Sequence, residues 1–425
     1  MTHVKVLLAS LAFAIAPCAL AQSVVGTGTR NPSNGHWYYL ASQASWSSAA
    51  NFATQTLHGS LVTINDAAEN QWVRSTFAPL CGCGRFWIGL NDVAQEGVYR
   101  WQSGEPVTYT NWEPGQPDNN GGIGPEEDGV EMGLTTPPFQ VIGAWNDLWD
   151  LPGGNYSIVE TTTPVPLAHY SFEGNFNDSS PNHFNAIAHG GAGFGIGPPG
   201  LGTAADFDGV NDWLEIVHGG VLSFDLDTES YTVAAWFHLE DLPNSTNEPC
   251  IIQDRLGTGN GPVSYNIIFL ADVSPQLLAS NTYYGEGTGT AYYLQTPAAG
   301  LVGQWHHVAL TYDHNGTGEK RFYIDGRLAT TPSPRPNEPF PGGNAIGTTI
   351  GGYINQFGNA TNFFKGQIDD LRIYNAVLTE AEIIALATPA VGACDDIDFN
   401  NDALFPDTRD IDAFLSVFSG GPCLY

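Results

Sequence analysis

Oxygen-bearing side chains are concentrated in one polar, glycine-rich stretch of the chain, from residue 112 to residue 147. The stretch contains Gln116-Pro117-Asp118, Glu127-Asp128 and Trp145-Asn146-Asp147. Calcium prefers hard oxygen ligands and takes about 6–8 of them, so calcium binding is the chemistry that these side chains could perform. An X–Pro bond adopts the cis form at little cost, and a cis Gln116–Pro117 bond would let both flanking side chains direct their oxygens to one side.

The composition excludes several classes of function. Of the 425 residues, 44 are acidic and 13 are Lys or Arg, which gives a formal net charge of −31. A polyanion repels nucleic acids and anionic lipids, so neither is an expected partner. The length exceeds one hydrophobic core, and the 50 glycines, 28 prolines and 12% aromatic residues favour many short strands and turns. We therefore expect a mainly β protein of two or three domains.

The first residues have the pattern of a secretory signal peptide. A basic start precedes an apolar run, Val6 to Ala16, that is too short to span a bilayer. Ala19-Leu20-Ala21 then forms a small-x-small cleavage site. We expect a signal peptide over 1–21, a flexible Gly/Thr/Ser-rich leader over 22–33, and a secreted, extracellular protein. No later segment reaches the ~18 apolar residues of a membrane span.

Five cysteines follow this segment, and disulfides are expected outside the cell. Cys394 and Cys423 bracket the last part of the chain and form the best candidate pair. Cys81 and Cys83 could form a small disulfide in a surface turn or bind a soft metal, and the turn is favoured. The odd count leaves one thiol over, which we assign to Cys250.

Local signals predict two helices and then strands in the first part of the chain. Ser45 caps a run in which Trp46, Ala49, Ala50 and Ala53 recur at helical spacing. Asn65 or Asp66 opens a second helix, with Glu69 three residues after Asp66. The expected strands are Arg85 to Leu90, Gly97 to Gln102, Gly129 to Leu134 and Tyr156 to Glu160. These elements would have to hold the oxygen-rich loop in place.

Residues 34–161 resemble a C-type lectin domain, an α+β fold with two helices, small sheets and a long ligand-binding loop. The resemblance rests on these ordered segments: His36-Trp37-Tyr38-Tyr39, Gly59-Ser60-Leu61-Val62-Thr63-Ile64, Glu69-Asn70-Gln71-Trp72, Trp87-Ile88-Gly89-Leu90, Gln116-Pro117-Asp118 and Trp145-Asn146-Asp147. It implies a calcium ion whose coordination is completed by two vicinal sugar hydroxyls. The implied ligands, here called the primary ligand set, are Gln116, Asp118, Glu127, Asn146 and Asp147.

The same resemblance implies a supporting calcium and a sugar preference. The residues that match the second ion, here called the secondary ligand set, are Asp92, Glu96, Asn119, Glu127 and Asp128. The order Gln-Pro-Asp is similar to the galactose-type members of the family, although the loop Asn119 to Glu126 lacks the aromatic residue that those members use. Family members usually carry two disulfides, whereas the matching positions here are Ala53, Gly129, Asp150 and Val159.

Residues 162–166 read as a Pro-containing linker, and residues 167–388 resemble the laminin-G-like, concanavalin A-like jelly roll, an antiparallel β-sandwich. The segments that carry this resemblance include Tyr170-Ser171-Phe172-Glu173-Gly174-Asn175, Asp206-Phe207-Asp208-Gly209 and Trp305-His306-His307-Val308-Ala309-Leu310. Asp325-Gly326 predicts a hairpin turn, and Thr379-Glu380-Ala381-Glu382 predicts a capped helix. His306 and His307 are adjacent in a strand, point to opposite faces, and are not expected to share one metal ion.

Residues 389–425 resemble half of a dockerin, with a small EF-hand-like loop followed by a helix. Asp398, Asn400 and Asp402 stand at the loop's first, third and fifth positions, and Asp410 follows one residue after the usual closing place. The resemblance implies a calcium-assisted cap or anchoring tag, and it leaves open an extracellular protein partner that the tail would contact.

The sequence thus predicts a secreted, calcium-dependent carbohydrate-binding protein that leans to galactose-type glycans, with the jelly roll as a second binding or spacer module. The first alternative is an extracellular adhesion or scaffold protein whose sugar site is idle. The second is a glycoside hydrolase, because Glu126 to Glu131 matches a Glu-x-Asp-x-x-Glu pattern and such enzymes use paired carboxylates. That pattern lies outside the jelly roll, and we expect no enzyme.

Overall fold

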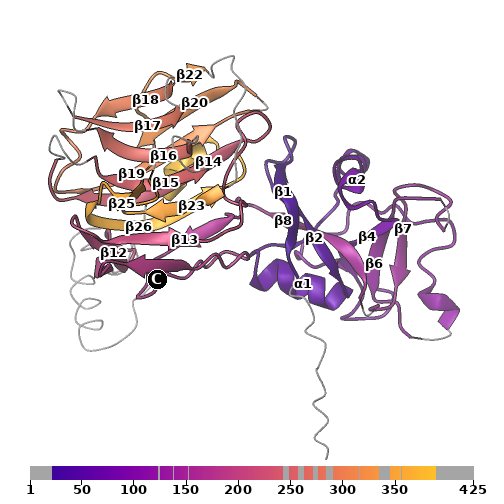
Figure 1. The fold of residues 1–425 in the computed structure, drawn as a ribbon. Coiled ribbons are helices and arrows are strands. Elements are labelled where there is room, and N and C mark those ends of the chain that lie inside the picture. The colour runs from indigo at the N-terminus through magenta and orange to yellow at the C-terminus, as the bar shows by residue number, and fades with distance from the viewer. Residues whose placement is uncertain are drawn as a thin grey trace, which may run out of the picture.

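The computed structural model describes most of the chain between residues 22 and 388. Its gaps are 123–124, 137, 152, 243–247, 257–262, 271–275, 284–290, 315, 335–344 and 356. The described residues form two β-rich domains joined by a short connection (Figure 1). The expected signal peptide and the expected tail, with Asp398, Asn400, Asp402, Asp410, Cys394 and Cys423, lie outside the described residues.

The N-terminal domain combines two helices with an 8-stranded sheet, counted over the residues that the structure describes. The strand order is β1-β2-β8-β4-β6-β7, with β3 beside β8 and β5 beside β4. The helical elements are α1 (Trp46–Gln55), α2 (Ala67–Cys81) and the 3-10 turn η1 (Asn119–Gly122). The strands are β1 (Val24–Arg30), β2 (Trp37–Ala44), β3 (Ser60–Leu61), β4 (Arg85–Asn91), β5 (Arg100–Trp101), β6 (Gly129–Gly133), β7 (Trp145–Leu148) and β8 (Asn155–Thr161).

Both helices begin where the sequence predicts. The Ser45 side chain accepts a hydrogen bond from the Ser48 N–H, and the Asp66 carboxylate accepts one from the Glu69 N–H. Each cap satisfies a backbone donor that the first helical turn leaves without a partner. The apolar face of α1 is buried against the sheet, through residues that include Trp46, Ala49 and Ala53.

The prediction of a flexible leader over residues 22–33 is wrong. Residues Val24–Arg30 form the edge strand β1, which pairs antiparallel with β2 from Val24 opposite Ala41 to Arg30 opposite Trp37. The register shifts between Val25 and Thr29, a bulge that includes Gly26 at φ +75°. A bulge accommodates a glycine without ending the pairing. The Gly/Thr composition therefore concealed a strand whose two valines pack against the domain's core.

The second domain is a sandwich of a 7-stranded and a 9-stranded sheet, again counted over described residues. The first sheet contains β10 (Ala186–His189), β13 (Trp213–Ile216), β23 (Ala345–Ile350), β15 (Cys250–Leu256), β16 (Val263–Leu270), β17 (Leu277–Tyr283) and β18 (Ala291–Pro297). The second contains β11 (Gly193–Ile196), β12 (Thr203–Asp208), β26 (Lys365–Tyr374), β14 (Tyr231–Leu239), β19 (Trp305–Tyr312), β20 (Glu319–Ile324) and β21 (Arg327–Leu328), with β22 (Ser333–Pro334) on β20 and β9 (Ala168–Tyr170) on β26. A further hairpin consists of β24 (Tyr353–Ile354) and β25 (Ala360–Thr361).

One large buried cluster fills the space between the two sheets, as aligned sandwich packing requires. The predicted hairpin is confirmed, because β20 and β21 pair across Asp325-Gly326, both at positive φ. The two histidines of β19 face different surroundings, as expected. His306 pairs with Asp325 at 2.9 Å, whereas His307 is buried with its ring beside Trp236. Burial lowers the pKa of His307 to about 4, which keeps it neutral.

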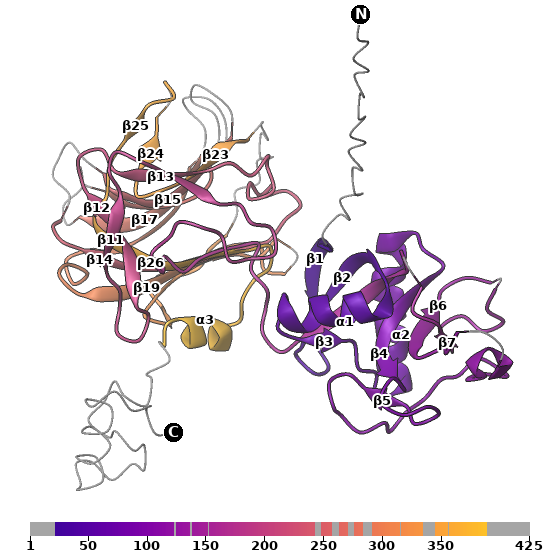
Figure 2. The same cartoon turned by 90° about the horizontal axis from the view of Figure 1, so that it is seen from below.

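Helix α3 (Glu380–Leu386) lies where the sandwich meets the N-terminal domain (Figure 2). It begins with the predicted capping box, in which Thr379 and Glu382 satisfy each other's backbone donors. One buried cluster spans both domains and contains Trp37 and Tyr39 of β2 together with Ile383 of α3. The Trp37 indole N–H donates to Glu382 at 2.8 Å, and the Val165 N–H donates to the Tyr39 hydroxyl at 2.7 Å.

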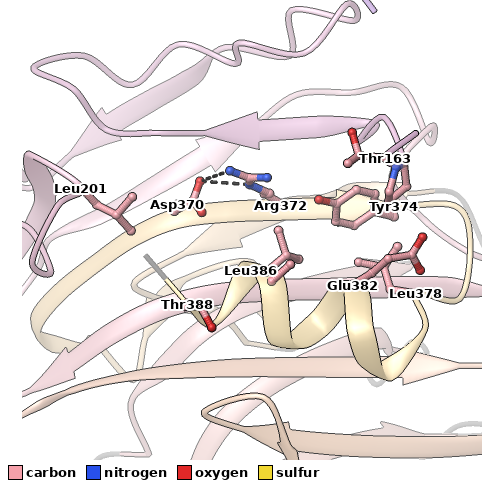
Figure 3. Close-up of a pocket in the computed structure, with 11 residues that line it drawn as sticks. Thr163, Leu201, Asp370, Arg372, Tyr374, Leu378, Glu382, Leu386 and Thr388 are labelled. Carbon is pink, nitrogen blue, oxygen red and sulfur yellow. Dashed lines mark hydrogen bonds and ion pairs between the residues drawn. The ribbon is translucent and has the colours of Figure 1, made fainter. Parts of the chain in front are cut away.

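A pocket of about 370 Å³ lies against this junction. Figure 3 shows it between β26 and α3, with Thr163 of the connecting segment at one side and Leu201 at the other. Its charged groups are already paired within the protein. The Arg372 guanidinium bonds Asp370, which also pairs with His169 at 2.7 Å. The junction is therefore held by packing and by hydrogen bonds from both domains.

Candidate functional site

Asp147, at the third position of β7, organises the oxygen-rich loop. Its side chain is fully buried, and its Oδ1 accepts the Asp118 N–H at 3.2 Å. Its Oδ2 accepts the Asn119 N–H at 2.9 Å and the Tyr99 hydroxyl at 3.2 Å. Strand β6 fixes β7 from the other side, with Val130 opposite Asp147. The sheet thus positions the loop through this carboxylate and through the backbone pairing of Trp112 with Trp145.

The carboxylates of the primary ligand set converge in the structure. Oxygens of Asp118, Glu127 and Asp147 all lie within 4.8 Å of one another. Glu127 is fixed from two sides, because its Oε2 accepts the Asn120 N–H at 2.6 Å and its own N–H donates to Asn119 Oδ1 at 2.9 Å. Three carboxylates at this spacing repel one another unless a cation lies between them.

The two amides of the set, Gln116 and Asn146, line one pocket. The Gln116–Pro117 peptide bond is cis, as the sequence analysis considered plausible. Gln116 Oε1 is buried and has no hydrogen-bond partner among the described residues. Asn146 donates through Nδ2 to Glu131 at 3.2 Å, so its carbonyl oxygen is the atom left for a ligand. A buried acceptor without a donor is costly, and a bound cation would satisfy it. The donor set therefore fits calcium.

The local electrostatics are those of an anionic site. Partial burial raises the pKa of the Glu127 carboxyl, and the negative charges of Asp147 and Asp118 raise it further, against the hydrogen bond from Asn120. Burial and the nearby Asp147 also raise the pKa of Tyr99, so its hydroxyl stays protonated and donates. A cation at this place would favour the ionised carboxylates and reverse the shift at Glu127.

The secondary ligand set forms a second acidic cluster beside the first. Oxygens of Asp92, Glu96 and Asp128 lie within 4.8 Å of one another. Asp92 is 2% exposed, its Oδ2 accepts the Gly97 N–H, and its Oδ1 has no partner among the described residues. Burial, together with neighbouring negative charges, raises the pKa of both Asp92 and Asp128. These atoms also fit a divalent cation with oxygen ligands.

Asn119 links the two clusters. Its Oδ1 accepts the Glu127 N–H, and its Nδ2 donates to Glu96 and to Glu126, both at 2.7 Å. An amide can act as donor and acceptor at once, whereas a carboxylate at this position could not donate to Glu96. The structure thus brings together three carboxylates of each set, and Asn119 joins the two clusters.

Some residues of the site were not found by sequence reasoning. Tyr99 reaches Asp147 from a different part of the chain, and Arg85 reaches Glu131 at 2.7 Å from the start of β4. The sequence offered no local signal for either contact, because both depend on how distant strands pair. Glu131, considered as part of a hydrolase pattern, is fully buried in β6 and accepts from Arg85, Asn146 and Asn155.

The described cysteines follow the sequence analysis. Cys81 and Cys83 form a disulfide directly after α2, and Cys250 is a free, buried thiol in β15. Burial raises the pKa of the Cys250 thiol well above its ordinary value, so it remains protonated. Among the described helices, none has the length and apolar composition that a membrane crossing needs.

Comparison with known families supports both domains. Residues 42–147 match the family described as the lectin C-type domain, and residues 208–384 match the family described as the concanavalin A-like lectin/glucanases superfamily. Among curated proteins, the chain is 40% identical over 119 residues to "C-type lectin domain family 17, member A" of Homo sapiens. The matched region covers 28% of this chain and 27% of that protein. It is 32% identical over 87 residues to perlucin of Haliotis laevigata, covering 20% and 56%.

The chain thus spans 56% or less of each of these two relatives, and both matches fall on a minor part of this chain. Among solved structures, the mouse scavenger receptor C-type lectin carbohydrate-recognition domain is 33% identical and covers 31% of this chain and 93% of that one, with a TM-score of 0.26. By the two family matches and their order along the sequence, the chain contains a C-type lectin domain followed by a laminin-G-like, concanavalin A-like domain.

Proposed function

We propose that this protein binds carbohydrate through a calcium ion held by the primary ligand set, Gln116, Asp118, Glu127, Asn146 and Asp147. The ion would accept two neighbouring sugar hydroxyls, and the ligand side chains would bond the same hydroxyls. The secondary ligand set would hold a second calcium that fixes the loop from behind. The bound metal supplies a positive centre for hydroxyl oxygens, and the protein supplies the geometry.

The observation that carries the proposal is the convergence of three carboxylates, from the same part of the chain as a buried amide oxygen that has no partner among the described residues. Asp118, Glu127 and Asp147 place oxygens within 4.8 Å of one another, and Gln116 Oε1 has no donor among the described residues. Net negative charge and an orphaned acceptor both favour a small, hard cation. Carbohydrate as the ligand rests on the C-type lectin match over residues 42–147.

The sugar class proposed is galactose-type, because the sequence reads Gln116-Pro117-Asp118 in the place where the family resemblance sets specificity. We also propose that the protein acts outside the cell, a compartment in which the Cys81–Cys83 disulfide would persist. The concanavalin A-like domain would serve as a second binding or spacer module. The protein would not be an enzyme, since Glu131 is buried and held by three donors rather than exposed for acid–base work.

The proposal is tested by retention on galactose-, mannose- and N-acetylglucosamine-bearing matrices, with calcium and then with chelator. We expect retention in calcium on the galactose matrix, elution by chelator, and at least tenfold weaker retention for Asp118→Asn. The change removes one ligand charge but keeps the backbone N–H that Asp147 accepts. The matched control is Asp208→Asn in the second domain, which removes the same charge far from the loop and should bind like the wild type.

Retention that persists in chelator would refute the calcium mechanism. Retention on no matrix, combined with normal calcium uptake, would instead favour an adhesion or scaffold protein with an idle sugar site. Cleavage of a bound oligosaccharide would contradict the assignment to a non-catalytic role.

A further inference from the structure

A second pocket lies directly beside the primary ligand set. It has a volume of about 280 Å³ and is lined by two ligand residues, Gln116 and Asn146. The other lining residues come from β4, β6, the segment between β5 and η1, and the loop between β6 and β7: Arg85, Glu113, Pro114, Glu131, Pro138, Phe139 and Gln140. Ligand pockets usually start at about 300 Å³, so this one has room for about one sugar residue. No other described member of the two ligand sets lines it.

The pocket is tied to the calcium ligands by hydrogen bonds. Glu131, fully buried, accepts from Arg85 Nη1 at 2.7 Å and from Asn146 Nδ2 at 3.2 Å. The Arg85 guanidinium also lies over the Phe139 ring, 5.6 Å from its centre. These contacts hold the guanidinium in one place while its side chain remains 32% exposed. Its donors are therefore available, in a fixed position, to a group that enters the pocket.

Hydrogen bonds also fix the part of the lining that contains Glu113 and Gln140. Glu113 is 7% exposed, and its two carboxylate oxygens accept the N–H groups of Gln140 and Val141 at 2.7 and 3.2 Å. This anchor holds the backbone of the loop that follows β6, while the Gln140 side chain stays exposed. Gln140 thus adds an amide donor and acceptor to a lining that also contains the Arg85 guanidinium, a combination that suits hydroxyl groups.

The charge of the lining selects among sugars. One cation, Arg85, stands with two carboxylates, Glu113 and Glu131, so the pocket carries no excess of positive charge. The chain as a whole has a net charge of −31. The negative charge would repel a sialic or uronic acid. A neutral sugar would form hydrogen bonds with Arg85 and Gln140 without this repulsion.

We propose that this pocket is a second sugar subsite, which binds a neutral residue linked to the sugar held on the calcium ion. The inference rests on the proposed function, since it assumes that Gln116 and Asn146 ligate the ion. It adds that the protein selects for oligosaccharides over monosaccharides, with Arg85 and Gln140 as the residues that determine this preference.

The test is titration calorimetry of the full chain in saturating calcium. The probes are methyl galactoside and methyl mannoside, each compared with a disaccharide that carries the same residue at its non-reducing end, lactose and α1,2-mannobiose. We expect the disaccharide of the preferred sugar to bind about tenfold tighter than its monosaccharide. Gln140→Ala and Arg85→Ala should each reduce that ratio several-fold, the usual scale for losing one or two hydrogen bonds, and Gln140→Ala should leave the monosaccharide and calcium affinities unchanged.

Arg85→Ala also leaves the buried Glu131 without its cation, so Gln140→Ala, with an exposed side chain, is the decisive variant. Arg100→Ala is the charge-matched control, because Arg100 pairs with Asn91 at the far end of β4 from Arg85. Equal affinity for monosaccharide and disaccharide, or an equal loss of both in Gln140→Ala, would overturn the subsite alone. Binding of neither sugar by a calcium-loaded protein would overturn the proposed function and the subsite together.

Discussion

At the scale of single residues, the site depends on carboxylates that are unfavourable without a cation. Asp92, Glu127 and Asp128 each have a pKa raised first by burial and then by neighbouring negative charge. Protons and calcium therefore compete for the same oxygens. Backbone N–H groups of Gly97 and Asn120 donate to Asp92 and Glu127 and help to hold these oxygens in place.

The raised pKa values predict how calcium affinity depends on pH. A raised pKa means that a carboxyl takes up its proton at a higher pH than an ordinary one near 4. We therefore expect calcium affinity to be full at neutral pH and to begin falling above the ordinary carboxylate range as the solution is acidified. Calcium titrations from pH 7.5 to pH 4 measure this. An affinity that stays constant down to pH 4 would contradict the account.

The residue types explain why most of this site was predictable. Five oxygen-bearing side chains stand at fixed spacings around Gln116-Pro117-Asp118, and a motif of that kind can be read directly. The four positions at which the family usually has cysteines show what the sequence could not predict. A Cβ at Gly129 would lie 2.8 Å from the Trp46 ring, and Asp150 accepts two hydrogen bonds from Ser47. Here packing and hydrogen bonds occupy places where the family uses disulfides, which only the folded structure reveals.

At the scale of elements, capping and turn signals predicted α1, α2, α3 and the β20–β21 hairpin correctly, because each is decided by a few neighbouring residues. Strand β1 was missed, since its pairing depends on β2 and not on its own composition.

Strand β26 contains an irregularity that also depends on how it pairs with a neighbouring strand. Its register with β14 shifts between Ala234 and Trp236, and Asp369 is fully buried there, with Oδ2 lacking a partner among the described residues.

The buried Asp369 predicts a pH-dependent stability of the second domain. Burial, with the charges of Asp370 and Glu173, raises its pKa to about 8 in the folded chain, against an ordinary value of 3.8. The folded state therefore holds a proton that the unfolded chain releases, and the stabilisation present at low pH is lost as the pH rises through 8. Asp369→Asn should remove this dependence and make the domain more stable than the wild type above pH 8.

Chemical denaturation in chelator at pH 5, 7 and 9 tests this prediction. The control is Asp370→Asn, which should destabilise the domain at neutral pH because Asp370 pairs with His169 and Arg372. Equal pH dependence in the wild type and in Asp369→Asn would show that Asp369 is ionised in the folded protein.

At the scale of the whole molecule, the two domains are joined by more than the connection between β8 and β9. A single buried cluster contains residues of β2, α1, β14, β19 and α3. Sequence patterns could identify each domain but not this contact, because the apolar residues concerned are also typical of each domain's own core. The interface also contains the Trp37–Glu382 hydrogen bond, and the pocket lined by Asp370, Arg372 and Glu382 lies against it.

The shared cluster predicts that the domains unfold together. In scanning calorimetry, we expect one transition whose midpoint rises with calcium, because a ligand stabilises the whole cooperative unit to which it binds. Ile383→Ala, which opens a cavity in the shared cluster and costs about 2–5 kcal/mol, should split this transition in two, with only one part sensitive to calcium. Two transitions in the wild type, with calcium acting on one alone, would contradict the coupling.

The central claim, that five side chains of the N-terminal domain hold a calcium ion, is tested most directly by calcium titration calorimetry on the full chain at pH 7.5. The account predicts saturable uptake at the primary ligand set, with Asp118→Asn losing at least tenfold in affinity there and Asp208→Asn binding like the wild type. Absence of any calcium uptake by the wild type, or an unchanged titration in Asp118→Asn, would contradict it.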